Sequence, residues 1–423
     1  MDMKVFIETY GCQSNQFSSE VVAGLLYDAG YQIVPQDEAD LIILNTCALQ
    51  TPTENRILRR LSELKLSRKK TLVIGCLTEV MKDKIEDVAP QASIASVSSA
   101  GHIVEIVKKI ESGSRVMRFK DKPISLLNSS KLRINPIVAI IPIAEGCLEN
   151  CTFCVDRITR GTLISNEPDH IIREAEAAIA NGAKEIHLVA QDVASYGTDT
   201  GMRLPALLRK LTLLPGEFKI KLGTMNPANV LSILADLVLS YNHPKMYRFV
   251  DLPLQSGSDK MLSGMGRNYT FAQYKNIISE FRKRYPNIAI STDVLIGFPG
   301  ETETDFGATT KAINEIKPDI LNIYQYSPRQ FTKAAALKDS VPSHVTKSRA
   351  DEMKGLALKY ADMANEHWMG WRGDVVVSEF EDGAPIGRNF AYKPVILPNQ
   401  RGKLGEVLTT EVVKTRADYL VGK

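Results

Sequence analysis

Continuous apolar runs alternate with helical patterns over most of this chain. The extended runs "KVFIETYGC", "ADLIILNTC" and "KKTLVIGC" fall within the first third, and the helical pattern "SNQFSSEVVAGLLYDAGY" follows the first of them. Apolar runs that lack a strict in–out alternation, separated by helices, predict a parallel sheet covered on both faces. We therefore expect an amino-terminal parallel α/β sheet domain.

The alternation resumes after a stretch rich in Ser, Asn and Lys that is typical of a linker. Strands are expected at 137–143, 186–189, 218–222, 249–252, 288–295 and 320–326. Helical patterns lie between most of them, such as 169–180 with its apolar residues on one face. Strand–helix units in this number predict a full or partial (β/α) barrel, whose site lies at the carboxyl ends of its strands.

The last part of the chain changes to short alternating runs separated by Gly, Pro and Asn, which predict a small β-barrel or sandwich. We expect an amino-terminal domain at 1–115, a linker at 116–135, a barrel at 136–365 and a small β domain at 366–423. Basic and aromatic residues in two turn-rich segments of the small domain suit an RNA surface, with solvated surface charge as the alternative. These residues are Arg388, Tyr392, Lys393, Arg401 and Lys403.

Bulk composition excludes several classes of protein. With 423 residues, 44% hydrophobic and 24% charged, the chain is typical of a globular protein of two or three domains. No run approaches the length of a membrane span, and the amino terminus lacks the pattern of a signal peptide, so we expect a cytoplasmic protein with no membrane partner. A net charge of +3 is too small to indicate nucleic-acid binding by itself.

The six cysteines form two sets of three. Cys147, Cys151 and Cys154 lie together in "EGCLENCTFC", directly after the first barrel strand. Cys12, Cys47 and Cys76 are far apart in the chain, but each follows a predicted strand of the first sheet. Because the carboxyl ends of parallel strands meet at one edge, we expect these three to converge.

Thiolates select zinc or iron–sulfur clusters, and a closed zinc site needs four protein ligands. Each set supplies only three. A four-iron cluster held by three cysteines keeps one iron free to bind another group. The alternative for Cys12, Cys47 and Cys76 is that they are small buried hydrophobic residues, because free cysteine is among the most buried residue types.

The motif Cys147-x3-Cys151-x2-Cys154, with Phe153 before its last cysteine, resembles that of the radical S-adenosylmethionine enzymes. The whole chain is similar to the methylthiotransferases of that superfamily, which end in a TRAM domain. The segments that carry this resemblance are "YGCQSN", "NTCAL", "IGCL", "RGTLISNEP", "EIHLVAQDVASYGTD", "DLPLQSGSDKMLSGMGRNYT" and "STDVLIGFPGETETDF".

The resemblance implies that each set of cysteines ligates a 4Fe-4S cluster. The cluster on Cys147, Cys151 and Cys154 would bind S-adenosylmethionine and cleave it to a 5′-deoxyadenosyl radical, and the other would present the sulfur that is methylated and transferred. No catalytic residue is assigned beyond the cluster ligands. Six positions at the barrel rim are candidates for binding S-adenosylmethionine: Gln191, Asp192, Ser256, Asp293, Gly297 and Arg160.

Two of these rim features also have purely structural explanations. A surface ion pair is an equal explanation for Arg160, and "GFPGET" by itself is also an ordinary strand-to-helix turn.

The segments "NTCAL", "IGCL" and "KLGTMNP" look most like the archaeal and eukaryotic branch that acts on N6-threonylcarbamoyladenosine at position 37 of tRNA. The resemblance therefore implies the tRNA anticodon loop, a reductant protein and a sulfur source as partners. The substrate's carboxylate requires a cationic pocket, for which Arg160, Lys221 and Arg329 are candidates.

Three alternatives stay open. They are another modified adenosine in tRNA, an aspartate of a ribosomal protein, and a non-enzymatic RNA-binding protein with structural metal sites.

Overall fold

The computed structural model describes residues 3–48, 50–67, 69–119 and 125–423. It begins with a parallel sheet in the order β2-β1-β3-β4-β5-β6. Its strands are β1 (Lys4–Thr9), β2 (Gln32–Ile33), β3 (Leu41–Thr46), β4 (Lys70–Gly75), β5 (Ser93–Ala95) and β6 (Met117–Arg118). Its helices are α1 (Gln13–Asp28), α2 (Thr51–Leu66), α3 (Leu77–Val80), α4 (Lys82–Val88) and α5 (Ile103–Glu111).

Helices cover both faces of this sheet, as its unbroken apolar strands require. Every residue of β3 is buried. One apolar cluster joins the sheet to α1 and α5, and a second joins the opposite face to α2 and α4. The prediction of a parallel α/β domain is confirmed.

The segment predicted as a linker contributes structure at both of its ends. β6 lies inside it and pairs with β5, while residues 120–124 lie outside the described part of the chain. Farther on, the backbone N–H of Leu132 donates to the Glu20 carbonyl at 3.0 Å and that of Ile134 to the Glu20 carboxylate at 3.0 Å. The end of this segment is thereby held along α1.

The middle of the chain is a partial barrel of parallel strands. Its order is β7-β10-β11 followed by β12-β13-β14, and a parallel bridge between Ile220 and Met246 joins the two halves. The strands are β7 (Val138–Pro142), β10 (Glu185–Val189), β11 (Lys219–Leu222), β12 (Phe249–Asp251), β13 (Ala289–Ile296) and β14 (Ile320–Gln325). All six match predicted strands.

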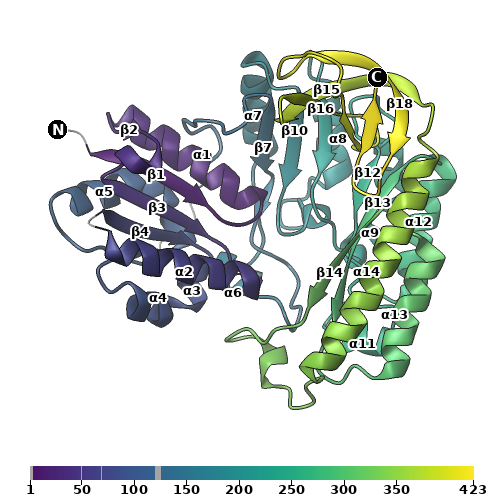
Figure 1. Ribbon diagram of the computed structural model, residues 1–423, viewed down its shortest axis with the longest axis horizontal. Helices are drawn as coiled ribbons and strands as arrows, with labels where there is room; N and C mark the ends of the chain where they lie inside the picture. The colour runs from purple at the N-terminus through teal and green to yellow at the C-terminus, as the bar shows by residue number, and fades with distance from the viewer. Residues whose placement is uncertain (1–2, 49, 68, 120–124) are drawn as a thin grey trace.

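Helices surround this barrel on its outer side (Figure 1). They are α7 (Pro168–Ala180), α8 (Leu204–Thr212), α9 (Pro227–Leu231), α10 (Leu234–Ser240), α11 (Asp259–Gly264), α12 (Phe271–Arg284), α13 (Glu303–Ile316) and α14 (Ser343–Glu366). A short helix, α6 (Asp156–Arg160), follows the cysteine loop, and a two-stranded ribbon pairs β8 (Ala144–Glu145) with β9 (Ile164–Ser165).

The chain ends in a closed barrel in the order β15-β16-β17-β19-β18. Its strands are β15 (Arg372–Glu381), β16 (Ala384–Arg388), β17 (Pro394–Ile396), β18 (Val407–Thr415) and β19 (Leu420–Gly422). The predicted small β-barrel is confirmed, although β16 was missed because Pro and Gly interrupt its apolar pattern.

The small barrel packs against the amino ends of the large barrel's strands, while the cysteine loop and α6 lie at their carboxyl ends (Figure 1). The backbone N–H of Arg248 donates to the Phe390 carbonyl at 2.8 Å, and Lys393 pairs with Asp319 at 2.9 Å. No helix in the described ranges is long and apolar enough to span a membrane.

Candidate functional site

The three separated cysteines converge at the carboxyl edge of the first sheet. β3 lies between β1 and β4 and pairs with both in parallel register, so the loops after the three strands are neighbours. A Cβ placed on Gly11 would lie only 2.8 Å from the Cβ of Cys47, which shows how closely the Cys12 loop approaches that residue. Cys12, Cys47 and Cys76 form no disulfide.

Two buried asparagines tie these loops together, and sequence reasoning did not single them out. The Asn15 side-chain amide donates to the Thr46 carbonyl at 2.9 Å, and its oxygen faces the Cys12 thiol at 3.4 Å. The Asn45 amide donates to the Asn15 carbonyl at 2.9 Å. A polar residue at the end of the apolar run "LIILN" is the signal that marks Asn45.

Gly75 is required where the Cys76 loop turns. Its φ of +103° lies in the region that favours glycine, and a Cβ there would approach the Thr46 carbonyl oxygen to 2.4 Å. A glycine therefore lets the Cys76 loop lie against the Cys47 loop.

The second set of cysteines lies in the loop after β7 and β8. Backbone N–H groups of Glu149 and Asp156 donate to the sulfurs of Cys147 and Cys154, both at 3.4 Å. The Arg267 guanidinium donates to the Cys151 sulfur at 3.4 Å. Hydrogen bonds to sulfur are one of the means by which proteins stabilise and tune iron–sulfur clusters.

Burial makes these thiols hard to ionise without a nearby cation. It raises the pKa of Cys147 to about 12, and it raises the pKa values of Cys154 and Cys76 above the ordinary value for a thiol. Bound metal supplies the missing positive charge and deprotonates a coordinating thiol. Three soft ligands in each set, most of them buried or partly buried, thus fit a metal group.

In the described ranges, no three Cys, His, Asp or Glu side chains approach closely enough to share one metal ion. A closed zinc site needs four ligands at about 2.3 Å from a single ion when they are thiolates. Each set of cysteines supplies three thiolates, one fewer than a closed zinc site needs, and three thiolates on a four-iron cluster leave one iron open.

Arg160 joins the two sets of cysteines. It ends α6, which begins two residues after Cys154, and its side chain is only 6% exposed. One guanidinium nitrogen donates to the Asn15 side-chain oxygen at 2.9 Å and the other to Glu145 at 3.2 Å. The positive charge of the guanidinium also acts on the Cys76 thiol and lowers its pKa against the effect of burial, so a residue predicted at the barrel rim reaches into the amino-terminal cysteine site.

Gln191 and Asp192 follow β10 at the rim. Asp192 is buried and accepts hydrogen bonds from the backbone N–H groups of Ala194 and Asn226 and from the Asn229 amide, at 3.0, 2.9 and 2.7 Å. Burial raises its pKa to about 6. The Gln191 side-chain oxygen is buried without a partner among the described residues, so it is free to accept from a ligand.

Ser256 and Asp293 have different surroundings. Ser256 is buried, and its hydroxyl bonds Thr309 at 3.1 Å and accepts from the Ser258 N–H at 3.2 Å, so it stabilises its own turn. Asp293 lines the barrel interior and accepts from the Asn322 amide at 2.9 Å. Burial raises the pKa of Asp293 to about 7, and the nearby Asp251 adds to the effect.

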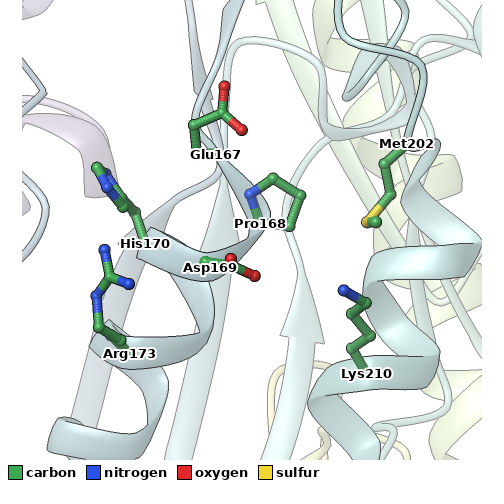
Figure 2. A pocket seen from close by; sticks show the side chains of 7 residues that line it. All are labelled: Glu167, Pro168, Asp169, His170, Arg173, Met202 and Lys210. Carbon is green, nitrogen blue, oxygen red and sulfur yellow. The ribbon is translucent and has the colours of Figure 1, made fainter.

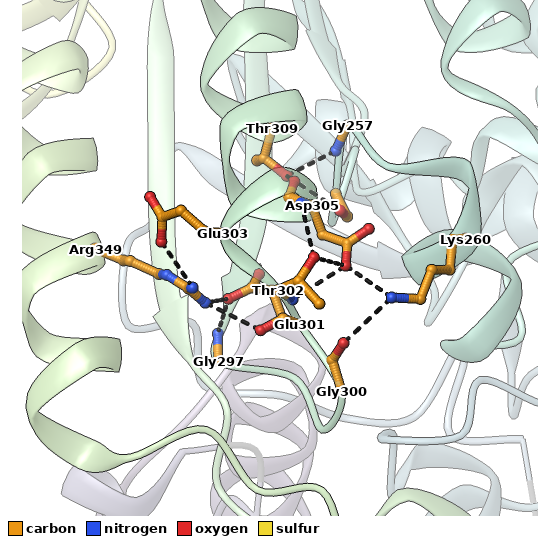
Figure 3. Close-up of polar contacts among 11 residues, drawn as sticks. Gly257, Lys260, Gly297, Gly300, Glu301, Thr302, Glu303, Asp305, Thr309 and Arg349 are labelled. Carbon is orange, nitrogen blue, oxygen red and sulfur yellow. Dashed lines mark hydrogen bonds and ion pairs between the residues drawn. The ribbon is translucent and has the colours of Figure 1, made fainter.

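The turn from Gly297 to Gly300 is braced by a buried ion pair (Figure 3). The Glu301 carboxylate accepts from the Gly297 N–H at 3.0 Å and pairs with Arg349 at 2.8 Å. Gly297 has a φ of +78°, and a Cβ there would lie 2.5 Å from the Thr346 hydroxyl oxygen. The segment "GFPGET" therefore forms a strand-to-helix turn that is held by a buried ion pair with α14.

Beside this turn lies a cavity of about 240 Å³, lined in part by Gly297, Pro299 and Tyr326. The Tyr326 hydroxyl is buried without a partner among the described residues. A cavity beside this glycine turn with one free hydroxyl fits a small polar ligand with a flat ring.

A second cavity, of about 410 Å³, opens between the start of α7 and α8 (Figure 2). None of the residues predicted for the site lines it. Its lining is Glu167, Pro168, Asp169, His170, Arg173, Met202 and Lys210.

The predicted RNA surface of the small barrel is only partly exposed. Arg401 and Lys403 are exposed. Lys393 is 5% exposed and paired with Asp319, and the Tyr392 ring lies 5.0 Å from that of Tyr247 on the floor of the large barrel. The prediction is wrong for Lys393, because an interdomain contact buries it, whereas Tyr392 is only partly buried by the same contact.

Two sequence families match the chain. Residues 4–96 match the one described as Uncharacterized protein family UPF0004, and residues 141–313 match the Radical SAM superfamily. The barrel with its cysteine loop is therefore that of a radical SAM protein.

Relatives match over the full length of the chain. A probable threonylcarbamoyladenosine tRNA methylthiotransferase of Pyrococcus abyssi is 37% identical over 100% of this chain and 99% of its own. The threonylcarbamoyladenosine tRNA methylthiotransferase of Mus musculus is 33% identical over 99% of this chain and 74% of its own. This chain belongs to the threonylcarbamoyladenosine tRNA methylthiotransferase family, as its sequence motifs predicted.

Solved structures share the fold at low sequence identity. The radical S-adenosylmethionine methyltransferase TsrM from Kitasatospora setae aligns with a TM-score of 0.59 and 14% identity, over 79% of this chain and 74% of its own. The cobalamin-dependent radical enzyme OxsB aligns with a TM-score of 0.55 and 11% identity, over 84% of this chain and 56% of its own.

Proposed function

We propose that this protein adds a methylthio group to carbon 2 of N6-threonylcarbamoyladenosine at position 37 of tRNA. The full-length similarity to relatives named for this activity carries the proposal. The position of Arg160 supports it, because this residue belongs to the helix that follows the barrel cysteine loop and donates to Asn15 beside Cys12, and the reaction needs two reactive centres that face one substrate.

In this proposal each set of three cysteines holds one 4Fe-4S cluster. When bound, the clusters and S-adenosylmethionine supply the radical that activates the carbon and the sulfur and methyl group that it receives. Backbone N–H groups of Glu149 and Asp156, with Arg267, would orient the thiolates of the barrel site. No protein side chain is assigned a catalytic role beyond the six ligands.

The rim residues would bind S-adenosylmethionine. Gln191 offers an unpaired acceptor, and the cavity beside Gly297 and Tyr326 offers a place for the flat adenine ring. Asp293 faces the barrel interior, where a raised pKa allows its carboxyl group to donate or to accept a hydrogen bond near neutral pH. Asp192 and Ser256 would act indirectly, because their polar atoms already hold the loops at the rim.

We further propose that the reaction takes place in the cytoplasm and requires a reductant protein and a separate sulfur source. The anticodon loop of tRNA would approach the space between the two cysteine sites.

Nucleoside analysis of tRNA tests the proposal. Total tRNA from a strain that lacks the gene should lose the 2-methylthio derivative of N6-threonylcarbamoyladenosine and retain the unmethylthiolated nucleoside. Unchanged levels of the methylthio nucleoside would overturn the proposal. Loss of a methylthio group from a different adenosine, or from an aspartate of a ribosomal protein, would replace the substrate and keep the chemistry.

A further inference from the structure

Lys221 places an unpaired positive charge inside the barrel. It belongs to β11, and its ammonium nitrogen lies 5.1 Å from the centre of the Phe249 ring and 5.2 Å from that of Tyr392. In the described ranges its ammonium has no hydrogen-bond acceptor and no ion-pair partner. Burial lowers its pKa. Ring faces attract a cation only weakly compared with a carboxylate, so the charge is not fully compensated.

The carboxylates nearest to Lys221 are occupied elsewhere. Glu185 accepts from the Tyr247 hydroxyl and bonds the His187 ring, both at 2.9 Å. Asp251 accepts from the Thr224 hydroxyl at 2.8 Å. Both carboxylates act on Lys221 through space and favour its charged form, but neither lies within ion-pair distance. On the small barrel, Arg388 adds positive charge and pairs with Glu379.

The strand beside Lys221 carries a residue that contacts the Cys12 loop. Gln13, the chain neighbour of Cys12, lies 2.6 Å from the His187 ring through its side-chain nitrogen. His187 is the register partner of Lys221 on the adjacent strand. Gln13 and His187 therefore link the Cys12 loop, where the proposed function places the sulfur, to the strand next to Lys221.

The other two cations considered for the substrate's carboxylate are already paired. Arg160 contacts Glu145, Asn15 and the Cys76 thiol. Arg329 forms an ion pair with Glu54 across the domain boundary. Of the three predicted candidates, only Lys221 is left without a partner in the described part of the chain.

We propose that Lys221 binds the carboxylate of the threonylcarbamoyl group and so selects this nucleoside over neutral adenosine derivatives. The inference rests on the proposed function and assigns its substrate specificity to one residue. A charge-assisted hydrogen bond is stronger in a site shielded from water, and a substrate without the carboxylate leaves the ammonium unpaired. Sites built to pair with a substrate's polar group reject analogues that lack it.

The experiment compares an acid with its neutral analogue on the same RNA. One anticodon stem-loop carries N6-threonylcarbamoyladenosine, and a second carries its methyl ester. Binding is measured by fluorescence anisotropy at a single salt concentration, and KM and kcat are measured on the reconstituted full chain. Wild type should bind the acid about tenfold or more tightly than the ester, which is the size expected for a charge-assisted hydrogen bond.

Lys221→Met should abolish this preference by weakening binding of the acid, with little change for the ester. Lys221→Arg should retain most of it. The control is Lys219→Met on the same strand, because Lys219 donates to the Pro244 carbonyl at 2.7 Å and faces no ligand in this proposal. The control should keep the wild-type preference.

Three results would overturn the inference. One is an unchanged preference in Lys221→Met, and another is equal loss of acid and ester binding in that variant. The third is that the wild-type protein modifies the acid but binds the acid and the ester equally tightly. By contrast, if the wild-type protein modifies neither RNA, the proposed function itself is contradicted. The inference about Lys221 is then contradicted as well, because it rests on that function.

Discussion

Each cysteine site contains thiols whose burial is costly, and it has one ligand fewer than a closed metal site needs. Cys47 and Cys76 are both 6% exposed, and burial raises the pKa of Cys76. A buried thiolate needs a metal or another cation beside it. At the scale of single residues, the six cysteines therefore make the most direct test of the proposed clusters.

Cys47→Ser should reduce the iron content of the reconstituted protein to about half of the wild-type value, because one of two proposed sites loses a ligand. Cleavage of S-adenosylmethionine with a reductant should persist. Cys151→Ser should also lose about half of the iron but abolish cleavage. Iron assay and chromatography of the cleavage products measure both. A Cys47→Ser protein with full iron content would contradict the assignment of that site.

Glu20 gives stability a pH dependence that is independent of the cysteines. Burial raises its pKa from the ordinary 4.5 to about 7 in the folded chain. Between these two pH values the folded chain binds the proton more tightly than the unfolded chain, so the free energy of unfolding falls as pH rises. Above pH 7 the loss is complete.

Glu20→Gln keeps an acceptor for the Ile134 N–H without the charge. It should match wild type near pH 5 and be more stable at pH 8 by up to about 3 kcal/mol. Urea denaturation at the two pH values measures this difference. A gap that stays constant between pH 5 and pH 8 would show that the Glu20 carboxyl group does not titrate in this range.

At the scale of elements, the turn between β13 and α13 depends on a partner from α14. Arg349 is 8% exposed and pairs with Glu301, which is 1% exposed, and also with the exposed Glu303 at 3.0 Å (Figure 3). In the first turn of α13, the carboxylate of Asp305 pairs with Lys260, whose side chain is 63% exposed. The buried and exposed cations therefore differ in solvent access. They provide a matched comparison around one turn.

Arg349→Met should lower the free energy of unfolding by about 3–5 kcal/mol, because it leaves a buried carboxylate unpaired. Lys260→Met should cost about 1 kcal/mol or less, since its ammonium is in water. Urea denaturation of both variants gives the comparison. Equal effects would indicate that Glu301 is protonated or solvated when Arg349 is absent.

Helix α6 connects the two cysteine sites through Arg160. Arg160→Met should increase hydrogen exchange of the amides of α3 and of the Cys12 loop about tenfold, because its charge-assisted hydrogen bond to Asn15 of the amino-terminal domain and its attraction to the Cys76 thiol are lost. Arg157→Met is the control on the same helix. Its guanidinium is exposed and donates only to the Leu148 carbonyl among the described residues, at 3.0 Å. Similar exchange in both variants would contradict a specific role for Arg160.

At the scale of the whole molecule, the small barrel completes the core of the large one. A single apolar cluster includes Tyr247, Phe249 and Ala289 of the large barrel with Val375 and Val395 of the small one. The Tyr392 ring packs 5.0 Å from Tyr247 and 5.3 Å from Phe249. We infer that the two barrels unfold together.

Tyr392→Ala should lower the free energy of unfolding by about 3 kcal/mol, because it opens a cavity between the two barrels. Both tryptophans, Trp368 and Trp371, lie at the start of the small barrel, so their fluorescence reports on it while circular dichroism reports on the whole chain. The two signals should shift together. Tyr27→Ala removes a 61% exposed ring and should change stability by less than about 0.5 kcal/mol. Separate transitions would contradict a shared core.

Apolar patterning predicted the strands well because burial on a sheet is repeated along consecutive residues. All six strands of the large barrel and the strands that precede Cys12, Cys47 and Cys76 were located in this way. The convergence of these cysteines also followed, since parallel strands bring their carboxyl ends to one edge. β16 was missed where Pro and Gly replace the apolar residues on which this signal depends. The domain bounds themselves remain a prediction.

The positions of most strands, the placement of the cysteines after them and the family were thus readable from local pattern and motif. The partners of the polar side chains were not, because a hydrogen bond or ion pair depends on which distant residues the folded chain brings within about 3 Å. Only folding brings Arg160 to Asn15, buries Lys393 against Asp319 and leaves Lys221 without a counter-charge in the described structure. These three cationic side chains therefore have different roles, and the residues that surround each of them decide which.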